Sequence, residues 1–183
     1  MTAVSASLTL VSSSIRAEKN SESQITAGNL AREGVEVVRA IRDSNWLAGR
    51  SFDAGLTGAS RDYSGVPVFD PAANSWSIDF TPDAITSDWA RVSRYVAASG
   101  NAVIGLMVQG ATVPVGAVIS PYRRLVSVDP LCDNGTGSYA IVTSGSDCGA
   151  NLKVGIRVTS TVQWATGGAA KTMSVEERMF DWR

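Results

Sequence analysis

Apolar and polar positions follow a helical period along "NLAREGVEVVRAIRDSNW", residues 29–46. On a helical projection at about 100° per residue, six small or apolar residues fall within a sector roughly 100° wide. These six residues are Ala27, Leu30, Gly34, Val37, Val38 and Ile41. Charged residues such as Arg32, Glu36 and Arg39 lie on the opposite side. A sector of this width is typical of a helix on a globular core, so the six residues are predicted to form the helix-to-sheet core.

A second apolar stripe precedes the first and points in another direction. Its members are Val4, Leu8, Val11 and Ile15, rotated by roughly 100° from the first stripe, and residues 18–24 between the two are polar. One helix over residues 1–47 would therefore serve two different surfaces. The alternative is two helices with a break near Asn20, although no Gly or Pro lies there.

After Trp46 the pattern changes to short apolar runs separated by Gly, Ser, Asp and Pro. The runs at 65–69, 75–80, 102–108 and 122–128 predict strands, and a helical turn is expected near Asp88. Residues 153–164 alternate strictly, with Val154, Ile156 and Trp164 among those on the apolar side. A Gly-Gly turn then predicts an antiparallel return to the end of the chain.

These elements predict an α+β fold, in which a long N-terminal helix packs on an antiparallel β-sheet. The helix is assigned to residues 1–47 and the sheet head with its loops to residues 48–183. Since 183 residues with 44% hydrophobic content fit a domain of ordinary size, the two parts are expected to form one domain.

Composition argues against several classes of function. A net charge of −1, with no basic cluster larger than Arg123-Arg124, disfavours nucleic-acid binding. The chain has no histidine, which removes His-based triads and most zinc hydrolase schemes. It also lacks the P-loop, the nucleophile elbow and the dinucleotide-binding glycine motif. We therefore predict no enzymatic activity, no catalytic residue and no cofactor.

The only two cysteines, Cys132 and Cys148, flank a polar, turn-rich segment. We predict a disulfide between them, which implies an oxidising compartment. The alternative is a pair of reduced thiols in a cytosolic protein. Two thiolates without histidine do not complete a tetrahedral zinc site, and no metal site is predicted.

Two other segments carry candidate chemistry. "DPLCDNGTG" places side-chain oxygens of Asp129, Asp133 and Asn134 around a Gly turn, which is a weak calcium-like pattern without the spacing of an EF-hand. Trp76 and Trp89 lie in polar surroundings and are the candidates for surface binding, for example of a glycan. The other tryptophans are expected to lie mostly in the core.

Two segments together resemble the bacterial type IV pilins and pseudopilins, particularly the minor pilins. "SESQITAGNLAREGVEVVRAIRDSNWL" is similar to the amphipathic second half of the family's N-terminal helix. "VTSTVQWATGGAAKTMSVEERMFDWR" resembles its closing hairpin, with Trp164 ending one strand and Trp182 near the C-terminus. The family's disulfide often staples a surface loop near the C-terminus, whereas Cys132 and Cys148 precede the last hairpin.

The resemblance implies a pilin-like roll and a structural role in an extracellular filament at the cell surface. Other pilin subunits would be the partners, and Val4, Leu8, Val11 and Ile15 would form the filament-side helix face. The family's processing site, a Gly before a Phe-rich apolar segment with Glu at its fifth position, is missing from this sequence. We therefore expect an apolar segment upstream of residue 1 that inserts into the inner membrane before assembly.

The resemblance leaves open whether the filament is a pilus, a secretion pseudopilus or a DNA-uptake filament. The alternative to a filament subunit is a filament-associated or exported binding module, adhesin-like, that uses its surface loops. An exported enzyme is the third reading.

Overall fold

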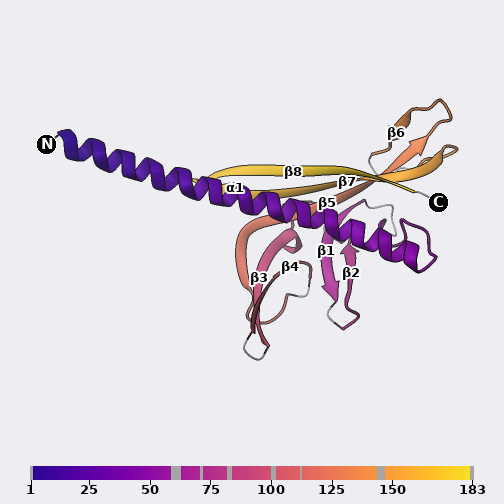
Figure 1. The fold of residues 1–183 in the computed structure, drawn as a ribbon, viewed down its shortest axis with the longest axis horizontal. Helices are drawn as coiled ribbons and strands as arrows, with labels where there is room; N and C mark the ends of the chain where they lie inside the picture. Colours follow the sequence, from indigo (N-terminus) through magenta and orange to yellow (C-terminus); the bar gives the residue numbers. More distant parts are fainter. Residues whose placement is uncertain are drawn as a thin grey trace.

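The computed structural model describes residues 2–58, 63–70, 72–81, 84–99, 102–111, 113–143 and 147–181, with the side chains of 2–7, 97–99 and 102–106 excepted. One long helix packs on an eight-stranded antiparallel sheet, which confirms the predicted α+β class (Figure 1). The elements are α1 (Thr2–Leu47), β1 (Ser64–Asp70), β2 (Ser75–Asp79), β3 (Arg91–Ser99), β4 (Ala102–Val108), β5 (Val118–Asp133), β6 (Tyr139–Ile141), β7 (Leu152–Thr166) and β8 (Ala169–Phe180).

Helix α1 runs without a break, so the alternative of two helices separated near Asn20 is wrong. Its C-terminal half lies along the sheet, whereas its N-terminal end projects beyond the sheet (Figure 1). The helix ends at Leu47, and Gly49, two residues later, lies in the left-handed region with φ of 69°. The N–H groups of Gly49 and Arg50 donate to the carbonyls of Trp46 and Asn45, the hydrogen-bond pattern of a Schellman cap.

All six residues of the predicted core stripe, Ala27, Leu30, Gly34, Val37, Val38 and Ile41, are buried. They pack against two groups of side chains on the sheet. Leu30 and Ala27 lie in one group with Tyr122, Val162 and Trp164. Val37, Val38 and Ile41 lie in the other with the group Val126, Val128, Ile156, Val158 and Met179. The strands supply these residues at every second position, as a half-buried sheet requires.

The sheet is organised around β5, which is 16 residues long. One edge of β5 pairs with β7 from Arg123 to Asp133, and β7 pairs in turn with β8. The other edge pairs in succession with β3, β1 and β6. The β1–β2 and β3–β4 pairs both extend away from the helix on this side (Figure 1).

The predicted hairpin at the end of the chain is present, and the expected turn near Asp88 is a short 3-10 helix over Asp88–Ala90. The strand β3 that follows this turn and the short strand β6 were missed. Trp182, which was part of the predicted hairpin, lies outside the described residues.

The helix and the sheet lie close together at Gly34. A Cβ atom at this position would lie 2.3 Å from Ser160 Oγ and 3.1 Å from Val126 Cγ2. Gly28, two turns earlier, is different because its Cβ would meet only the end of the flexible Met173 side chain, at 3.3 Å. The absence of a side chain at Gly34 therefore sets how near α1 lies to the sheet.

We expect Gly34→Ala to lower the free energy of unfolding by about 1–3 kcal/mol, because the added methyl group overlaps the sheet. Gly28→Ala is the matched control, and we expect it to be neutral or to stabilise by up to about 1 kcal/mol through higher helix propensity. Urea unfolding of both variants measures the difference. Adding Ser160→Gly to Gly34→Ala should recover part of the loss, and equal effects of the two alanines would contradict the close contact.

A buried arginine lies between the helix and the sheet. Arg124 is 1% exposed, and its Nε donates to Oε1 of Gln109 at 2.6 Å. Its Nη1 donates to the carbonyl of Leu30 at 3.1 Å and lies 3.4 Å from the Glu33 carboxylate. Burial lowers the pKa of Arg124 from its ordinary value, although Glu33 opposes that shift. The helix is therefore attached to the sheet by a polar contact inside the apolar layer.

Candidate assembly and binding surfaces

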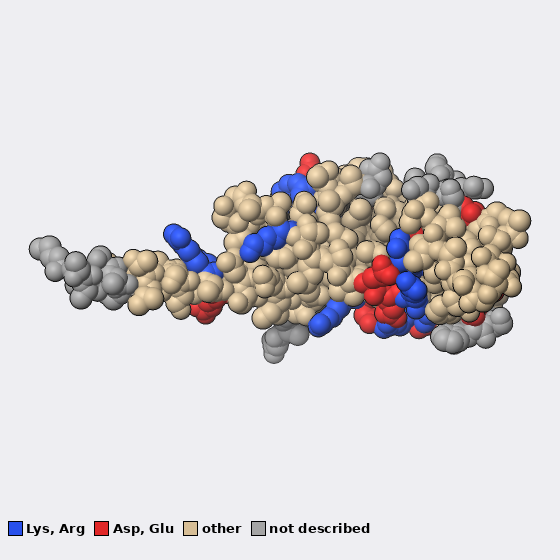
Figure 2. All heavy atoms as spheres, turned by 90° about the horizontal axis from the view of Figure 1, so that it is seen from above, with Lys and Arg blue, Asp and Glu red and all other residues tan. Residues whose placement is uncertain are grey.

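The predicted filament-side face of α1 is exposed. Leu8 is 63% exposed, Val11 57% and Ile15 48%, while the side chain of Val4 lies outside the described residues. These four residues are called the helix stripe below. In Figure 2 the described part of the thin projecting end carries no charged side chain on its outer stretch, and basic and acidic side chains appear where it meets the head. Apolar side chains in a row on an exposed helix are typical of a contact surface.

The exposed face of α1 continues past the helix stripe. Glu18 and Glu22 follow Ile15 at intervals of three and four residues, so they lie on the same side of the helix, and Ile25 follows them. All three are exposed. Sequence reasoning set residues 18–24 aside as a polar gap and missed Ile25, although its spacing from Glu22 could have shown that it shares this face.

A second exposed apolar region lies on the head, where β3, β4 and β5 meet. Val96 of β3, Val118 of β5, and Val113 and Val115 of the segment before β5 are exposed, with Val115 almost fully so. We call these four residues, with Arg94, the lobe patch. The sequence "VPVGAV" at 113–118 carries a signal that was missed, because its valines show no helix or strand periodicity that a buried element would need.

The two tryptophans proposed for surface binding differ in how exposed they are. Trp76 is half-buried, and its ring lies 5.1 Å from that of Phe69 and packs on the core below the helix. Trp89 is 39% exposed and lies on the 3-10 turn. Trp89 is therefore the more accessible of the two.

Charged groups on the body of the molecule are largely paired with one another. Arg39 of α1 reaches Glu36 and Glu177 of β8, both at 2.5 Å. On the sheet, Arg157 lies 2.6 Å from Asp129. Figure 2 shows basic and acidic side chains side by side over this part of the molecule. Such exposed pairs contribute little stability each, but they leave no strong net charge to attract an anionic polymer.

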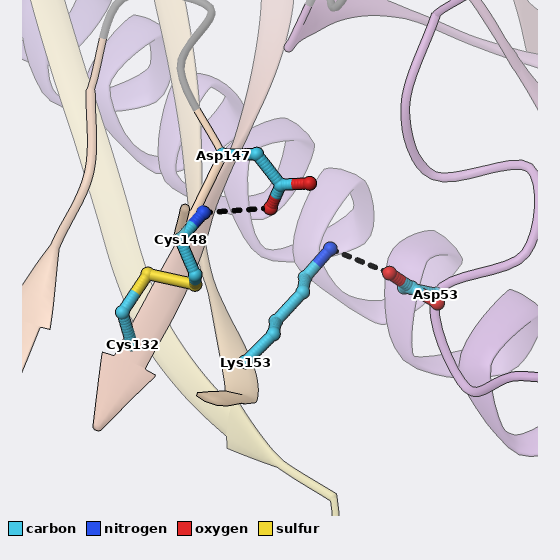
Figure 3. The surroundings of a disulfide bond; sticks show 5 residues. All are labelled: Asp53, Cys132, Asp147, Cys148 and Lys153. Carbon is cyan, nitrogen blue, oxygen red and sulfur yellow. Dashed lines mark hydrogen bonds and ion pairs between the residues drawn. A yellow bond between two sulfur atoms is a disulfide. The ribbon is translucent and has the colours of Figure 1, made fainter. Parts of the chain in front are cut away.

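Cys132 and Cys148 form the predicted disulfide, with their Cα atoms 5.4 Å apart (Figure 3). The bridge lies near the end of β5, and β6 belongs to the loop that it closes. The Cys148 N–H donates to the Asp147 carboxylate. The disulfide thus joins the far end of the turn-rich segment back to strand β5.

Close to the disulfide, Lys153 of β7 reaches across to Asp53 in the segment after α1, with Nζ 2.5 Å from Oδ2 (Figure 3). Partial burial on its own would raise the pKa of Asp53, but hydrogen bonds from Lys153 and Ser51 outweigh it and hold the pKa below its ordinary value. The ionised carboxylate is thus favoured in the folded state. This pair connects the end of the helix to the disulfide end of the sheet.

We expect Cys132→Ala combined with Cys148→Ala to lower the free energy of unfolding by about 3 kcal/mol, because the bridge closes a short loop in the unfolded chain. The fold should persist, since the helix–sheet core lies elsewhere. Urea unfolding without reductant measures the loss. No change in stability would mean that the pairing of β6 with β5 already holds the loop.

In the calcium-like segment, the side-chain oxygens of Asp133 and Asn134 accept hydrogen bonds from within the turn. Asp133 Oδ1 accepts the N–H of Gly135, and Asn134 Oδ1 accepts both the N–H and the hydroxyl of Thr136. Asp129 is engaged by Arg157 on the sheet, away from this turn. The structure does not bring the three predicted oxygen donors together, and in the described ranges no three His, Cys, Asp or Glu residues gather as a metal-binding group.

Comparison with protein-family models, curated proteins and solved structures finds no match to this chain. Over the described ranges, no helix combines the length and apolar character needed to cross a bilayer.

Proposed function

We propose that this chain is a structural subunit, of the minor kind, of a bacterial type IV pilus or pseudopilus filament. The observation that carries the proposal is the helix stripe, which has an apolar face and no sheet beneath it while the rest of the same helix is buried on the head. A helix with one half packed on its own head and one half left apolar and exposed fits a subunit whose neighbours supply the missing contact. The role is structural, and it uses no catalysis.

The helix stripe alone does not provide enough energy for stable assembly. Full burial of one aliphatic side chain gains about 1.5–3 kcal/mol, and these side chains are already partly covered. Association costs roughly 4–15 kcal/mol before any gain appears. We therefore expect the chain by itself to remain unpolymerised and catalytically silent in solution, with the rest of the filament contact supplied by an apolar segment joined ahead of the helix.

The test is to join the chain to the apolar leader segment of a host pilin and express it in a bacterium with filament machinery. The fused protein should enter the membrane and appear in sheared filaments, detected by immunogold electron microscopy. Val11→Asp with Ile15→Asp should reduce its incorporation without lowering its thermal stability. Release of the fused protein into the medium, or full incorporation of the double variant, would overturn the proposal.

A head-borne binding site is the second candidate, and the exposed Trp89 favours it. Trp89 follows Asp88 on the 3-10 turn, and the Asp88 carboxylate forms ion pairs with Arg91 and Arg123. An aromatic ring among ordered polar groups is a common platform for sugars. Loss of glycan-array binding on Trp89→Ala, with filament incorporation unchanged, would show that this function exists beside the structural one.

A further inference from the structure

We propose that the helix stripe of one copy docks on the lobe patch of a second copy of this chain. The inference rests on the proposed filament function and names the surface of the neighbour that the helix meets. Both surfaces belong to the same chain, and the apolar side chains described on each, Leu8, Val11 and Ile15 on the helix and the four valines on the head, are exposed. They lie on different parts of the molecule, the projecting end of α1 and the region where β3 and β5 pair (Figure 1).

Charge is the first reason for choosing this partner. Glu18 and Glu22 extend the exposed face of the helix stripe, and neither forms an ion pair with another described residue. The helix therefore presents a row of apolar side chains followed by two carboxylates, with Lys19 at one edge of the same face. A docking surface that fits it needs apolar side chains next to a cationic group.

Pairing of two helix stripes in parallel does not meet this need. It would bring Glu18 and Glu22 of both copies opposite one another, and like charges facing each other across a contact are destabilising. Arg16 lies on another side of the helix by the same projection, whereas Lys19, four residues after Ile15, borders the helix stripe on the side away from Glu18 and leaves Glu22 at its centre. A surface with an unpaired cation complements the central Glu22 better than a second copy of the same helix face does.

The lobe patch meets both requirements. Val118 of β5 is paired directly with Arg94 of β3, so the two side chains lie next to each other on one side of the sheet. Val96 shares that side because it is two residues along the strand. Arg94 is exposed and, among the described residues, makes no ion pair. An exposed cation with no ion pair to another described residue thus lies beside two exposed valines, Val118 and Val96.

A contact between two different surfaces of one chain closes into a dimer or ring only if the rotation between copies brings the free surfaces together. Where it does not close, each copy that donates its helix stripe still has its own lobe patch open, and subunits held in a filament add head to tail in an open series. This geometry is the one that a filament requires. It also explains why the chain can carry two exposed apolar regions without either covering the other within one molecule.

Chemical crosslinking of single-cysteine variants tests the docking, because the described part of the chain has no free cysteine. Ile15→Cys and Val118→Cys proteins are mixed at high concentration and treated with a short bismaleimide, without reductant. We expect a crosslinked heterodimer in excess over either homodimer. Leu152→Cys, at an exposed position near the disulfide end, is the control for random collision.

The charges are tested in the same assay. Arg94→Glu on the Val118→Cys protein should reduce the heterodimer yield about tenfold, which corresponds to about 1.4 kcal/mol of contact energy. Glu18→Arg with Glu22→Arg on the Ile15→Cys protein should restore it. All of these positions are exposed, so the variants should fold, and circular dichroism checks that they do.

Other outcomes separate this inference from the proposed function. A dominant Ile15–Ile15 homodimer would overturn the lobe patch as the partner, while filament incorporation of the leader-fused chain would still support the subunit role. Heterodimer yield no greater than that of the Leu152→Cys control would also overturn the inference. Loss of incorporation in the leader fusion, with the heterodimer present, would overturn the filament function instead.

Discussion

Val37→Asp should abolish the folded head, with a loss of about 4 kcal/mol or more in the free energy of unfolding. Val37 is buried between α1 and the sheet in a group of aliphatic side chains, where a carboxylate would have no water and no partner. Val11→Asp places the same change in the same helix at a position that is 57% exposed. We expect that variant to unfold at nearly the temperature of the unchanged protein.

Val37→Asp and Val11→Asp are matched variants because both replace a valine by an aspartate in the same helix. Helix propensity and net charge therefore change equally in the two proteins. Thermal unfolding followed by far-UV circular dichroism measures both variants. Equal destabilisation would mean that both halves of α1 serve one core. The filament proposal would then lose the observation on which it depends.

Regular periodicity explains which parts of the fold could be predicted from the sequence. The buried stripe of α1 and the closing hairpin have long uninterrupted patterns, and both are present as expected. The direction of the helix stripe was also readable, since it depends only on residue spacing along a continuous helix. The partner that covers the helix stripe could not be predicted from the sequence, because an exposed row of apolar residues has the same pattern whichever partner covers it.

The extent of β5 could not be predicted because it contains prolines, which ordinarily interrupt central strands. Pro121 lies where pairing with β3 is irregular, between Ile119 and Arg123, so its missing N–H breaks no regular ladder. The carbonyl of Pro130 accepts the N–H of Val142, so its nitrogen faces that edge and not β7. The prolines are accommodated by gaps in the partner strands, and those gaps are set by the tertiary arrangement.

The rule that charged residues lie on the surface fails at Arg124, which is buried. It shares the parity of Tyr122, Val126 and Val128, so strict alternation places it on the buried side. The neighbouring Arg123 made the pair look like a surface cluster. A charged residue on the apolar side of an alternating strand predicts either a break in the strand or a buried polar contact. The structure shows a buried polar contact at Arg124.

Arg124→Ala should lower the free energy of unfolding by about 3–5 kcal/mol, the second-largest effect expected in this protein. The substitution removes the largest fully buried side chain and leaves a cavity between α1 and the sheet. It also leaves the buried Gln109 Oε1 without its donor at 2.6 Å, and the Leu30 carbonyl without its second hydrogen bond. Urea unfolding at neutral pH measures the loss.

Two further variants divide this loss into its causes. Arg124→Met keeps most of the volume but not the charge, so it should cost about 1–3 kcal/mol, the penalty for the unpaired Gln109 oxygen. Glu33→Gln removes only the 3.4 Å ion pair to a half-exposed carboxylate and should cost about 1 kcal/mol or less. If Arg124→Met costs as much as Arg124→Ala, the hydrogen bonds and not the packing hold the helix to the sheet. If Glu33→Gln costs as much as either, the buried charge depends on its carboxylate, and the stability of the head rests on an ion pair that reaches across from α1.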